Sequence, residues 1–430
     1  MKKVFLVILI VAMIFSISAM AKTHLVWSVH WTDFQVDGVK DEDGNLVTKG
    51  IQQYVDEYMA LNPEIEIEIQ SVPFDEYLKK ILISHTAGQV SDIYGLYSLW
   101  GVQLVESGIL DNVPAEVEKL VSENCVEAAY NGSMIDGKLR GIPMEIDNYA
   151  LLYNKDILAE SGFENPPKTW QEMAEMASKM TKRSEDGTVD RYGFAFLSGW
   201  DSAVVHPYLS LLYSLGGNMF NEDFTECTLD SPEALEALKE ELVLFKNGAT
   251  DPAASVYGFA SGKAAMIIMA PWYETSLRIS FKDEYENKVG VAPFPYLKTP
   301  MTAGYTWFLG VDRASNHKKE AWEFLKWLTF DKMENGASRL GELMALNIAA
   351  IPPMKFDIEA YPDELDDLYT SVFVNELKNT ISEPNVAQGQ EIKTILMREI
   401  VEAWHGQKSP EEALRIAKEE IDEILEEFYF

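Results

Sequence analysis

Near the N-terminus an apolar strand, an amphipathic helix and an alternating strand follow one another, and this order constrains the fold more than any other feature. Residues 25–29 (LVWSV) are typical of a short buried strand. Residues 50–61 have the period of an amphipathic helix, and residues 65–69 alternate isoleucine with glutamate, as a half-buried strand does. The apolar face of the helix comprises Ile51, Val55, Tyr58 and Met59. Strand, helix and strand in this order predict a parallel α/β unit.

The first 21 residues have the three parts of a secretory signal peptide. Two lysines precede an apolar run over residues 4–17, and residues 18–21 (SAMA) supply the small side chains of a cleavage site. Cleavage would make Lys22 the first residue of the mature protein. An uncleaved signal anchor is the alternative, because the apolar run approaches the length that spans a bilayer. We expect a secreted protein, periplasmic or associated with the cell surface.

The size and the charge of the chain narrow its architecture and its partners. With 430 residues, 47% of them hydrophobic, the chain exceeds the usual size of one domain and can form a core in each of two lobes. Its formal net charge of −33 opposes binding to nucleic acid and to anionic membrane surfaces. The same charge disfavours a strongly anionic ligand unless a local basic pocket compensates for it.

Motifs for catalysis, cofactors and metals are missing from the sequence. It contains no G-x-G-x-x-G, no Walker P-loop and no H-E-x-x-H, and its six histidines are scattered. In residues 258–262 (GFASG) the serine is fourth, whereas a nucleophile elbow needs it third. We therefore expect a protein that is not an enzyme, without catalytic residues, cofactor or metal. A glycosidase-like pair of carboxylates remains an alternative among 69 acidic residues.

Two turns predict β-hairpins. They lie at Asp43-Gly44 and at Asp186-Gly187. The acids around Asp43 fall at alternate positions, which also suggests a calcium loop, but Leu46 and Gln52 stand where an EF-hand needs glycine and glutamate. A hairpin is the better interpretation of that segment.

Cap residues mark the starts of three later helices. Thr169 and Glu172 form a capping box, and Ser231-Pro232 and Ser409-Pro410 place proline in a first turn. The second helix is expected to end at Gly248. The expected buried faces are Leu235, Leu238, Leu242 and Phe245 in the second helix and Leu414, Ala417, Ile421, Leu425 and Phe428 in the third.

The two cysteines, Cys125 and Cys227, are far apart in the sequence and belong to no metal-binding pattern. Isolated cysteines are most often small buried hydrophobic residues, and a disulfide between them is the alternative in an oxidising compartment.

Aromatic residues stand beside polar residues in four loop-like segments: 30–33 (HWTD), 199–201 (GWD), 271–274 (PWYE) and 304–307 (GYTW). Sugar sites need this mixture, because the apolar face of a pyranose packs on an aromatic ring while its hydroxyls need directional acceptors and donors. Core packing is the alternative for each single residue. From these segments the candidate ligand-binding residues are Trp31, Asp33, Trp200, Asp201, Trp272, Tyr305 and Trp307.

Several segments, in a fixed order, resemble those of a known family. They are residues 88–93 (GQVSDI, with Ser91 where proline is usual), 137–143 (GKLRGIP), 152–156 (LYNKD), 167–172 (PKTWQE), 262–266 (GKAAM) with 271–272 (PW), and 319–325 (KEAWEFL). Together they resemble the extracellular solute-binding proteins of ABC importers, in the carbohydrate group that includes maltodextrin-binding protein. The resemblance covers nearly all of the mature chain.

The resemblance implies a two-lobed α/β fold of the periplasmic-binding-protein type, in which each lobe is a mixed sheet flanked by helices and the ligand cleft lies at the hinge. The implied N-terminal lobe comprises residues 22–146 and 307–350, and the implied C-terminal lobe comprises residues 147–306 and 351–430. The chain would cross between the lobes near residues 145–150, 303–309 and 351.

The resemblance also implies positions in the cleft. Asp147 corresponds to the cleft carboxylate that precedes the LYNKD segment, and Trp272 to the stacking tryptophan of the Pro-Trp pair. Less directly, Trp31 and Asp33 follow the first strand, Tyr305 lies in the second crossing, and Tyr97 and Ser98 follow Asp92. The segment at Tyr97 lacks the tryptophan, acid and arginine of maltodextrin-binding protein, which puts maltodextrin itself in doubt.

These inferences predict the secreted binding component of an ABC importer, which captures a mono- or oligosaccharide and delivers it to the membrane permease. We expect a monomer. A polyol, cyclitol or uronate as the ligand is an alternative, and Arg140 is the one basic residue near the expected cleft. A secreted carbohydrate-active enzyme is the alternative from another class. The sequence does not distinguish one sugar from another.

Overall fold

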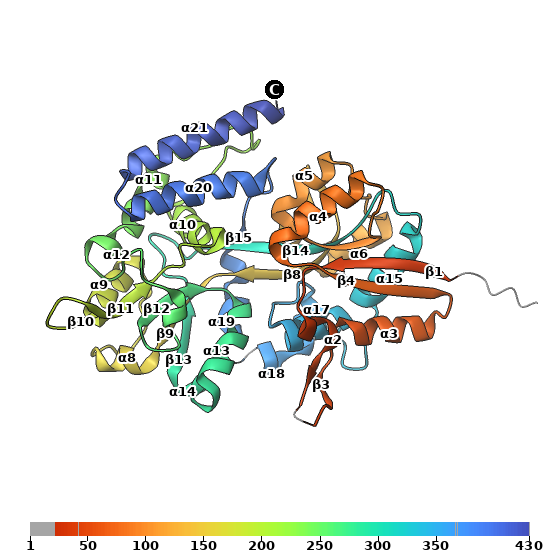
Figure 1. The fold of residues 1–430 in the computed structure, drawn as a ribbon, viewed down its shortest axis with the longest axis horizontal. Helices are drawn as coiled ribbons and strands as arrows, with labels where there is room; N and C mark the ends of the chain where they lie inside the picture. Colours follow the sequence, from red (N-terminus) through yellow and green to blue (C-terminus); the bar gives the residue numbers. More distant parts are fainter. Residues whose placement is uncertain (1–21, 42, 366, 368, 430) are drawn as a thin grey trace, which may run out of the picture.

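The computed structural model of the protein describes residues 22–41, 43–365, 367 and 369–429. The predicted signal peptide, residues 1–21, lies outside the described residues. Two mixed β-sheets, each covered by helices, form the body of the molecule, which confirms the predicted α/β fold class. Figure 1 shows the larger sheet on the right and the smaller sheet on the left, with β8 and β15 between the two bodies.

The larger sheet has six strands in the order β15-β14-β5-β1-β4, with β8 also paired to β14. Their bounds are β1 Thr23–Val29, β4 Ile65–Ser71, β5 Ile93–Tyr97, β8 Ile142–Asn148, β14 Thr302–Val311 and β15 Thr380–Ser382. Strand β1 is parallel to β4 and to β5, whereas β14 runs antiparallel to both β5 and β8. Strand β14 therefore lies in the middle of this sheet.

The predicted strand, helix and strand near the N-terminus are β1, α3 (Ile51–Leu61) and β4. The two strands are parallel, from the pair Thr23 and Ile65 to the pair Val29 and Ser71, which confirms the α/β unit. The buried face of α3 is Ile51, Tyr54, Val55 and Tyr58. Met59 is only half-buried, whereas Tyr54 is buried and its hydroxyl donates a hydrogen bond to Glu342 at 2.7 Å.

The smaller sheet has five strands in the order β10-β11-β12-β9-β13. Their bounds are β9 Ala150–Asn154, β10 Lys182–Arg183, β11 Val189–Ala195, β12 Ala264–Met269 and β13 Val289–Pro293. Strand β11 lies directly against helix α9 (Trp170–Met180): a Cβ atom added at Gly193 would stand 1.7 Å from the carbonyl oxygen of Ala177. This close approach requires glycine.

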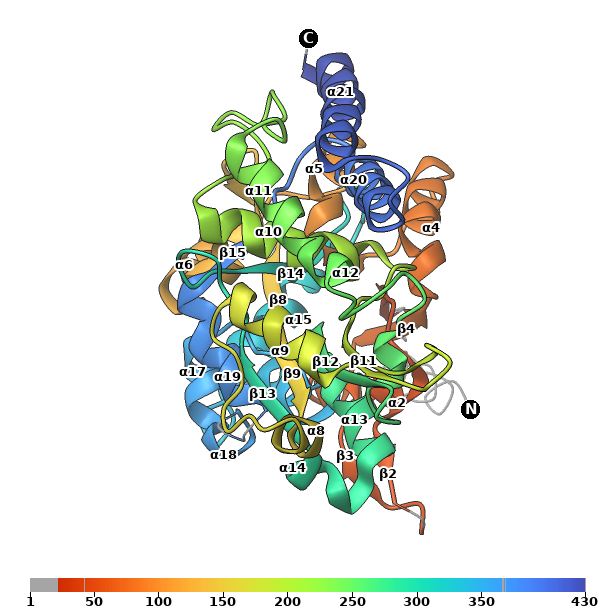
Figure 2. The same cartoon turned by 90° about the vertical axis from the view of Figure 1, so that its left-hand side faces the viewer.

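The helices cover both sheets. In chain order the others are α2 Asp33–Asp37, α4 Phe74–Thr86, α5 Gly101–Glu106, α6 Ala115–Asn124, α7 Glu127–Gly132, α8 Lys155–Glu160, α10 Asp201–Leu215, α11 Pro232–Glu241, α12 Val243–Lys246, α13 Glu274–Phe281, α14 Tyr285–Lys288, α15 Lys318–Phe330, α16 Arg339–Leu343, α17 Lys355–Ala360, α18 Pro362–Leu365, α19 Thr370–Glu376, α20 Gly389–Trp404 and α21 Pro410–Tyr429. Figure 2 shows α21 at the top of the molecule, and α20 and α11 each pack against both α10 and α21.

The predicted turns and caps are confirmed. Strands β2 (Val39–Lys40) and β3 (Leu46–Thr48) form the first hairpin, and β10 and β11 form the second. Thr169 and Glu172 form the capping box of α9. The helix that starts at Ser231 differs from the prediction in one respect: it is divided at Leu242 into α11 and α12. Leu238 and Leu242 are buried, while Leu235 and Phe245 are half-buried.

The chain passes between the two sheets at short connections. Strand β8 belongs to the larger sheet and β9 to the smaller one, and only Tyr149 separates them. The chain returns between β13 and β14, and Ile351 forms an isolated bridge with Ile146. Residues 147–148 and 302–306, expected in the C-terminal lobe, pair within the larger sheet. The lobe bounds given above remain a prediction.

Cys125 and Cys227 are buried free thiols, so the interpretation as isolated hydrophobic residues is confirmed over the disulfide. Among the described residues, no helix combines the length and the apolar character needed to span a bilayer.

Candidate functional site

Four of the predicted site residues lie on one face of the larger sheet. Trp307 on β14 is paired with Tyr97 on β5 and with Glu145 on β8, and Tyr305 on β14 is paired with Asp147 on β8. Paired residues on neighbouring strands point to the same face, and so do residues two apart on one strand. The register shifts between Trp307 and Phe308, because β8 has an extra residue there, Met144, between the paired Pro143 and Glu145.

Aromatic rings cover this face. The rings of Tyr97 and Trp307 are stacked at 5.3 Å and 18°, and Tyr305 meets Tyr97 edge-on at 5.6 Å. The ring of His30 stacks on Trp307 at 3.9 Å. Burial lowers the pKa of His30 to about 4, so its imidazole is neutral at physiological pH. The face therefore offers flat apolar surfaces with polar edges.

The smaller-sheet body contributes two tryptophans. Trp272 lies in the short 3-10 turn η3 (Pro271–Tyr273), and its indole Nε1 donates a hydrogen bond to the hydroxyl of Tyr305 at 2.8 Å. Trp200, just before α10, meets Trp272 edge-on at 5.4 Å. Trp272 is half-buried. The two tryptophans and Tyr305 thus form one continuous aromatic group across the two bodies.

A pocket of about 430 Å³ adjoins this aromatic group. Gln390 of α20 joins its two sides, because it accepts a hydrogen bond from Trp100 Nε1 at 3.2 Å and donates one to Asp201 Oδ2 at 2.6 Å. Helix α4 contributes two charged residues to the lining of this pocket, Asp75 and Lys79. The full lining is Phe74, Asp75, Leu78, Lys79, Trp100, Gly199, Trp200, Asp201, Gln390, Thr394 and Met397.

A buried ionic cluster lies behind Tyr97. Lys393 Nζ donates hydrogen bonds to Glu383 Oε2 at 2.7 Å, to the Tyr97 hydroxyl at 2.8 Å and to Ser202 Oγ at 2.9 Å. His206 Nε2 lies 2.9 Å from the same oxygen of Glu383. Burial acts to raise the pKa of Glu383, but the charge of Lys393 and the contacts with His206 outweigh it and lower that pKa to about 2. Glu383 is therefore ionised and holds Lys393 in place.

Two carboxyl groups on β8, those of Glu145 and Asp147, lie opposite Trp307 and Tyr305 without a basic partner in the described part of the chain. Burial, and then the charge of Asp147, raises the pKa of Glu145 well above its usual range. Burial raises the pKa of Asp147 to about 7, although a hydrogen bond from Tyr305 acts against it. One oxygen of Asp147 has no hydrogen-bond partner, and the same holds for the hydroxyls of Ser98 and Tyr149, which are also buried. These groups can bind the polar rim of a ligand.

Two predicted site residues lie apart from this group. Trp31 is buried, with its ring edge-on to Trp27 in the core of the larger-sheet body at 5.8 Å. Asp33 is exposed in the first turn of α2. Their part in ligand binding stays a prediction. Arg140 is half-buried near the β6–β7 hairpin (Met134–Ile135 and Lys138–Leu139), where its backbone N–H donates to Ser133.

The sequence interpretation missed several polar residues of the site. Trp100 follows Tyr97 closely and stands in the same kind of aromatic segment, so its signal was present. Glu145 precedes Asp147 by two positions, the period at which a strand repeats its face, and that signal was present as well. Lys393 and Glu383 could not be predicted, because a lysine in a helix and a glutamate in a loop are usually exposed, and no sequence pattern indicates that these two are buried as a pair.

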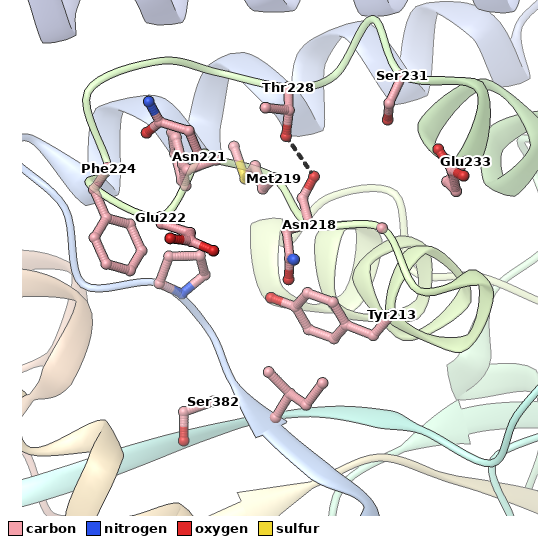
Figure 3. A pocket seen from close by; sticks show the side chains of 14 residues that line it. Tyr213, Asn218, Met219, Asn221, Glu222, Phe224, Thr228, Ser231, Glu233 and Ser382 are labelled. Carbon is pink, nitrogen blue, oxygen red and sulfur yellow. Dashed lines mark hydrogen bonds between the residues drawn. The ribbon is translucent and has the colours of Figure 1, made fainter.

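A larger hollow, of about 610 Å³, lies elsewhere, between the end of α10, the loop before α11 and β15. Figure 3 shows Tyr213, Asn218 and Phe224 around it, with Thr228 donating a hydrogen bond to the Asn218 carbonyl at 2.7 Å. Its lining contains none of the predicted site residues. Asn221 and Ser231 use their side chains to hold the local loop and to cap α11. We therefore place the candidate site at the aromatic group and not here.

Comparison with known proteins gives three similarities. Residues 44–334 match the family of bacterial extracellular solute-binding proteins. A protein of Brucella abortus (strain 2308), named as a binding protein, is 27% identical over 378 residues, which are 86% of this chain and 88% of that protein. The maltodextrin-binding protein of Bacillus subtilis (strain 168) is 25% identical over 388 residues, 85% of each chain.

Solved structures share the fold. The crystal structure of the cyclic α-maltosyl-1,6-maltose binding protein from Arthrobacter globiformis matches with a TM-score of 0.77. The match covers 94% of this chain and 100% of that one, at 21% identity. At this identity the similarity establishes a common architecture of two lobes.

Proposed function

Because the chain belongs to the family of bacterial extracellular solute-binding proteins, we propose that it captures a sugar, either a mono- or an oligosaccharide, and delivers it to the membrane permease of an ABC importer. The observation that carries the proposal is the group of Trp272, Tyr305 and Asp147. It puts two aromatic rings and a buried carboxyl beside one another, with one carboxyl oxygen still lacking a partner. A sugar fits this group, because its apolar ring face can pack on the aromatic rings and its hydroxyls can donate hydrogen bonds to the carboxyl oxygen.

The proposed ligand-binding residues are those around the aromatic group and the pocket: Tyr97, Ser98, Asp147, Trp200, Asp201, Trp272, Tyr305 and Trp307, with Trp31 and Asp33 as further residues. The relatives support a sugar, since maltodextrin is the ligand in the name of the Bacillus subtilis protein. A polyol or cyclitol needs the same groups. A uronate is the weaker alternative, because the buried cation of the site, Lys393, is already neutralised by Glu383.

A thermal-shift screen over sugars, polyols and uronates tests the proposal, because a ligand that binds only the folded state raises the melting temperature. At a ligand concentration 100 times the Kd the stabilisation is about 2.7 kcal/mol. Isothermal calorimetry on the best ligand then gives its affinity. If no sugar or polyol binds, the proposal is wrong.

We propose further that the protein binds its ligand without converting it, as a monomer outside the cytoplasmic membrane. Chromogenic glycosides distinguish the binder from the secreted enzyme: saturable binding without release of the chromophore is expected, and turnover would favour the enzyme. The intact mass of secreted protein is expected to begin at Lys22, and a mass that retains residues 1–21 would favour the signal anchor. Light scattering on the purified protein measures its oligomeric state.

A further inference from the structure

Strand β8 carries a second carboxylate beside the one that the sequence predicted. Glu145 and Asp147 are two residues apart, so both point to the face that also bears Tyr305 and Trp307. The rise of a strand puts their Cα atoms roughly 6.5–7 Å apart. Both are buried, with exposed fractions of 7% for Glu145 and 1% for Asp147. Two acidic side chains therefore share one enclosed region.

Neither carboxylate has a basic partner. In the described ranges, no ion pair of Lys, Arg or His involves Glu145 or Asp147. The buried Lys393 is paired with Glu383 instead. Among the described residues, the carboxyl group of Glu145 is in no ion pair, and burial and the charge of Asp147 are what act on its pKa. Of the other buried acids, Glu383 and Glu399 each bind a lysine. In the same part of the chain, Glu241 and Asp357 also lack a basic partner, but each accepts a hydrogen bond, from Trp404 and from Ser338.

A separate observation points to a ligand at this place. The hydroxyls of Tyr149 and Ser98 have no partner, although each residue is only 1% exposed. Tyr149 lies close to Asp147, because its ring centroid is 6.3 Å from that of Tyr305, which is paired with Asp147. Buried polar groups in folded proteins are almost always paired, so these free hydroxyls and the free oxygen of Asp147 can form hydrogen bonds with a bound molecule.

The charge of the pair restricts what that molecule can be. Two carboxylates in a region of low dielectric constant repel each other, and burial disfavours both charges. Without a cation, Glu145 therefore keeps its proton, as its raised pKa indicates, and a neutral sugar leaves that state unchanged. An ammonium group supplies three donors and a positive charge, and can bind both carboxylates at once. The net charge of −33 also attracts cations to the protein.

We propose that the ligand is an amino sugar or an aminocyclitol, whose positively charged amine lies between Glu145 and Asp147. This inference rests on the proposed function, since it names the chemical class of the ligand in the same site. Asp147 provides the carboxylate that any sugar ligand would use. Glu145 selects the charged amine against the hydroxyl or the acetamide at the same position of the ring.

The test uses ligands that differ in one substituent. Calorimetry compares glucosamine, galactosamine and mannosamine with their N-acetyl forms and with the parent hexoses, and chitosan oligosaccharides with chitin and cellulose oligosaccharides of equal length. The amine ligand of a matched set is expected to bind at least about tenfold more tightly than the other two, because a hydrogen bond between charged groups is about twice as strong as a neutral one. An equal or weaker affinity for the amine overturns the inference.

Two variants locate the selectivity. Glu145→Gln keeps the shape and removes the charge, and is expected to reduce the ratio of the amine affinity to the neutral-sugar affinity by about tenfold or more. Glu66→Gln, which changes an exposed carboxylate on β4, is the matched control and should alter neither affinity. If Glu145→Gln keeps the preference for the amine, the assignment to Glu145 is wrong. The comparison in the wild-type protein decides the ligand class even if the variant fails to fold.

The outcomes separate this inference from the proposed function. Tight binding of neutral sugars without preference for the amine leaves the proposed function standing and overturns the inference. Binding of no sugar in either form overturns both.

Discussion

Tyr305 is the residue that joins the parts of the candidate site. Its hydroxyl accepts the hydrogen bond from Trp272, its ring is parallel to that of His206 at 5.6 Å, and its edge meets Tyr97. Through His206 it lies next to the ionic pair of Glu383 and Lys393. A ring held from so many sides loses little freedom when a ligand packs on it, which favours tight binding.

The first prediction at the residue scale concerns Trp272. Trp272→Ala removes a large aromatic surface and the hydrogen bond to Tyr305, and should cost roughly 2–4 kcal/mol of binding free energy, about 30- to 1,000-fold in affinity. Trp272→Phe keeps a ring but not the indole N–H, and should recover much of the loss. Calorimetry on the best ligand measures both. Affinity close to that of the wild type in Trp272→Ala would overturn the site.

Asp147 carries the second prediction at this scale, in which binding and stability change in opposite directions. Asp147→Asn should weaken ligand binding by about 1.5–3 kcal/mol, because an amide replaces a charged acceptor. In the protein without ligand the same change should stabilise the fold at neutral pH. A carboxyl whose pKa is raised to about 7 on folding favours the folded state fully only below its unfolded pKa, and that stability is lost as the pH rises towards 7.

Unfolding of the two proteins at pH 4 and at pH 7.5 measures this effect. Relative to the wild type, Asp147→Asn should gain about 2–4 kcal/mol in the free energy of unfolding between the two pH values, since one pKa unit corresponds to about 1.4 kcal/mol. A constant difference across that range would mean that Asp147 is ionised in the folded protein.

Residues of the site were predictable where side-chain chemistry and local context agree. Trp272, Tyr305 and Trp307 were recognised because an aromatic residue stands beside polar ones in each segment, whereas Tyr97 was implied only by the family resemblance. Trp31 has the same local context but lies in the core, since a segment of four residues does not tell which side of a strand end faces the cleft.

Among the elements, helix α20 carries Lys393, whose burial makes the stability of the fold depend on its ion pair with Glu383. Lys393 is buried with Glu383, and removing one charge of a buried pair leaves the other without compensation. Lys393→Met should therefore lower the free energy of unfolding by roughly 3–5 kcal/mol at pH 7. It should also weaken ligand binding, because the Tyr97 hydroxyl loses its donor.

The loss in Lys393→Met should depend on pH and on Glu383. Pairing lowers the pKa of Glu383 to about 2, so its stabilisation is present above the unfolded pKa of about 4.3 and is lost as the pH falls towards 2. The difference from the wild type should shrink below pH 4, and the double variant with Glu383→Gln should be more stable than Lys393→Met alone. The control is Lys239→Met, which breaks an exposed pair with Glu411 and should cost less than about 1 kcal/mol. Equal losses in the two lysine variants would contradict the role of the buried pair.

Elements were predictable where their sequence pattern is local. The alternation in β4, the capping box of α9 and the two hairpin turns all depend on residues within one element. Helix α10 differs, because most of its residues are buried on every side beneath α11 and α20 and leave no amphipathic period. Strand β14 is buried along its whole length, so its sequence has no polar alternation from which its neighbouring strands could be predicted.

At the scale of the whole molecule, the prediction concerns closure. The connections between the two sheets are short, and residues from both bodies meet at the hydrogen bond between Trp272 and Tyr305. A bound ligand should therefore favour a more closed arrangement of the lobes. Small-angle scattering with saturating ligand should show a smaller radius of gyration, and Trp272→Ala at the same ligand concentration should not. An unchanged profile in the wild type would indicate a rigid pocket.

The two-lobed architecture followed from the order of motifs along the chain and not from any single pattern. That order predicts which segments share a lobe but not where each crossing lies, because the boundary is set by the hydrogen-bond partners of β8 and β14. Residues 147–148 of β8 and 304–305 of β14, which were expected in the C-terminal lobe, pair with one another in the larger sheet.

Strand β14 has a consequence for how this protein can change over evolutionary time or in the laboratory. Its residues 305 and 307 form the proposed binding surface, and its backbone ties together β5, β8 and β15. A substitution there alters affinity and the mechanics of the molecule together, so selection for a new ligand cannot act on one without the other. The freer route to a new specificity runs through Trp200, which lies outside both sheets and lines the pocket from the start of α10.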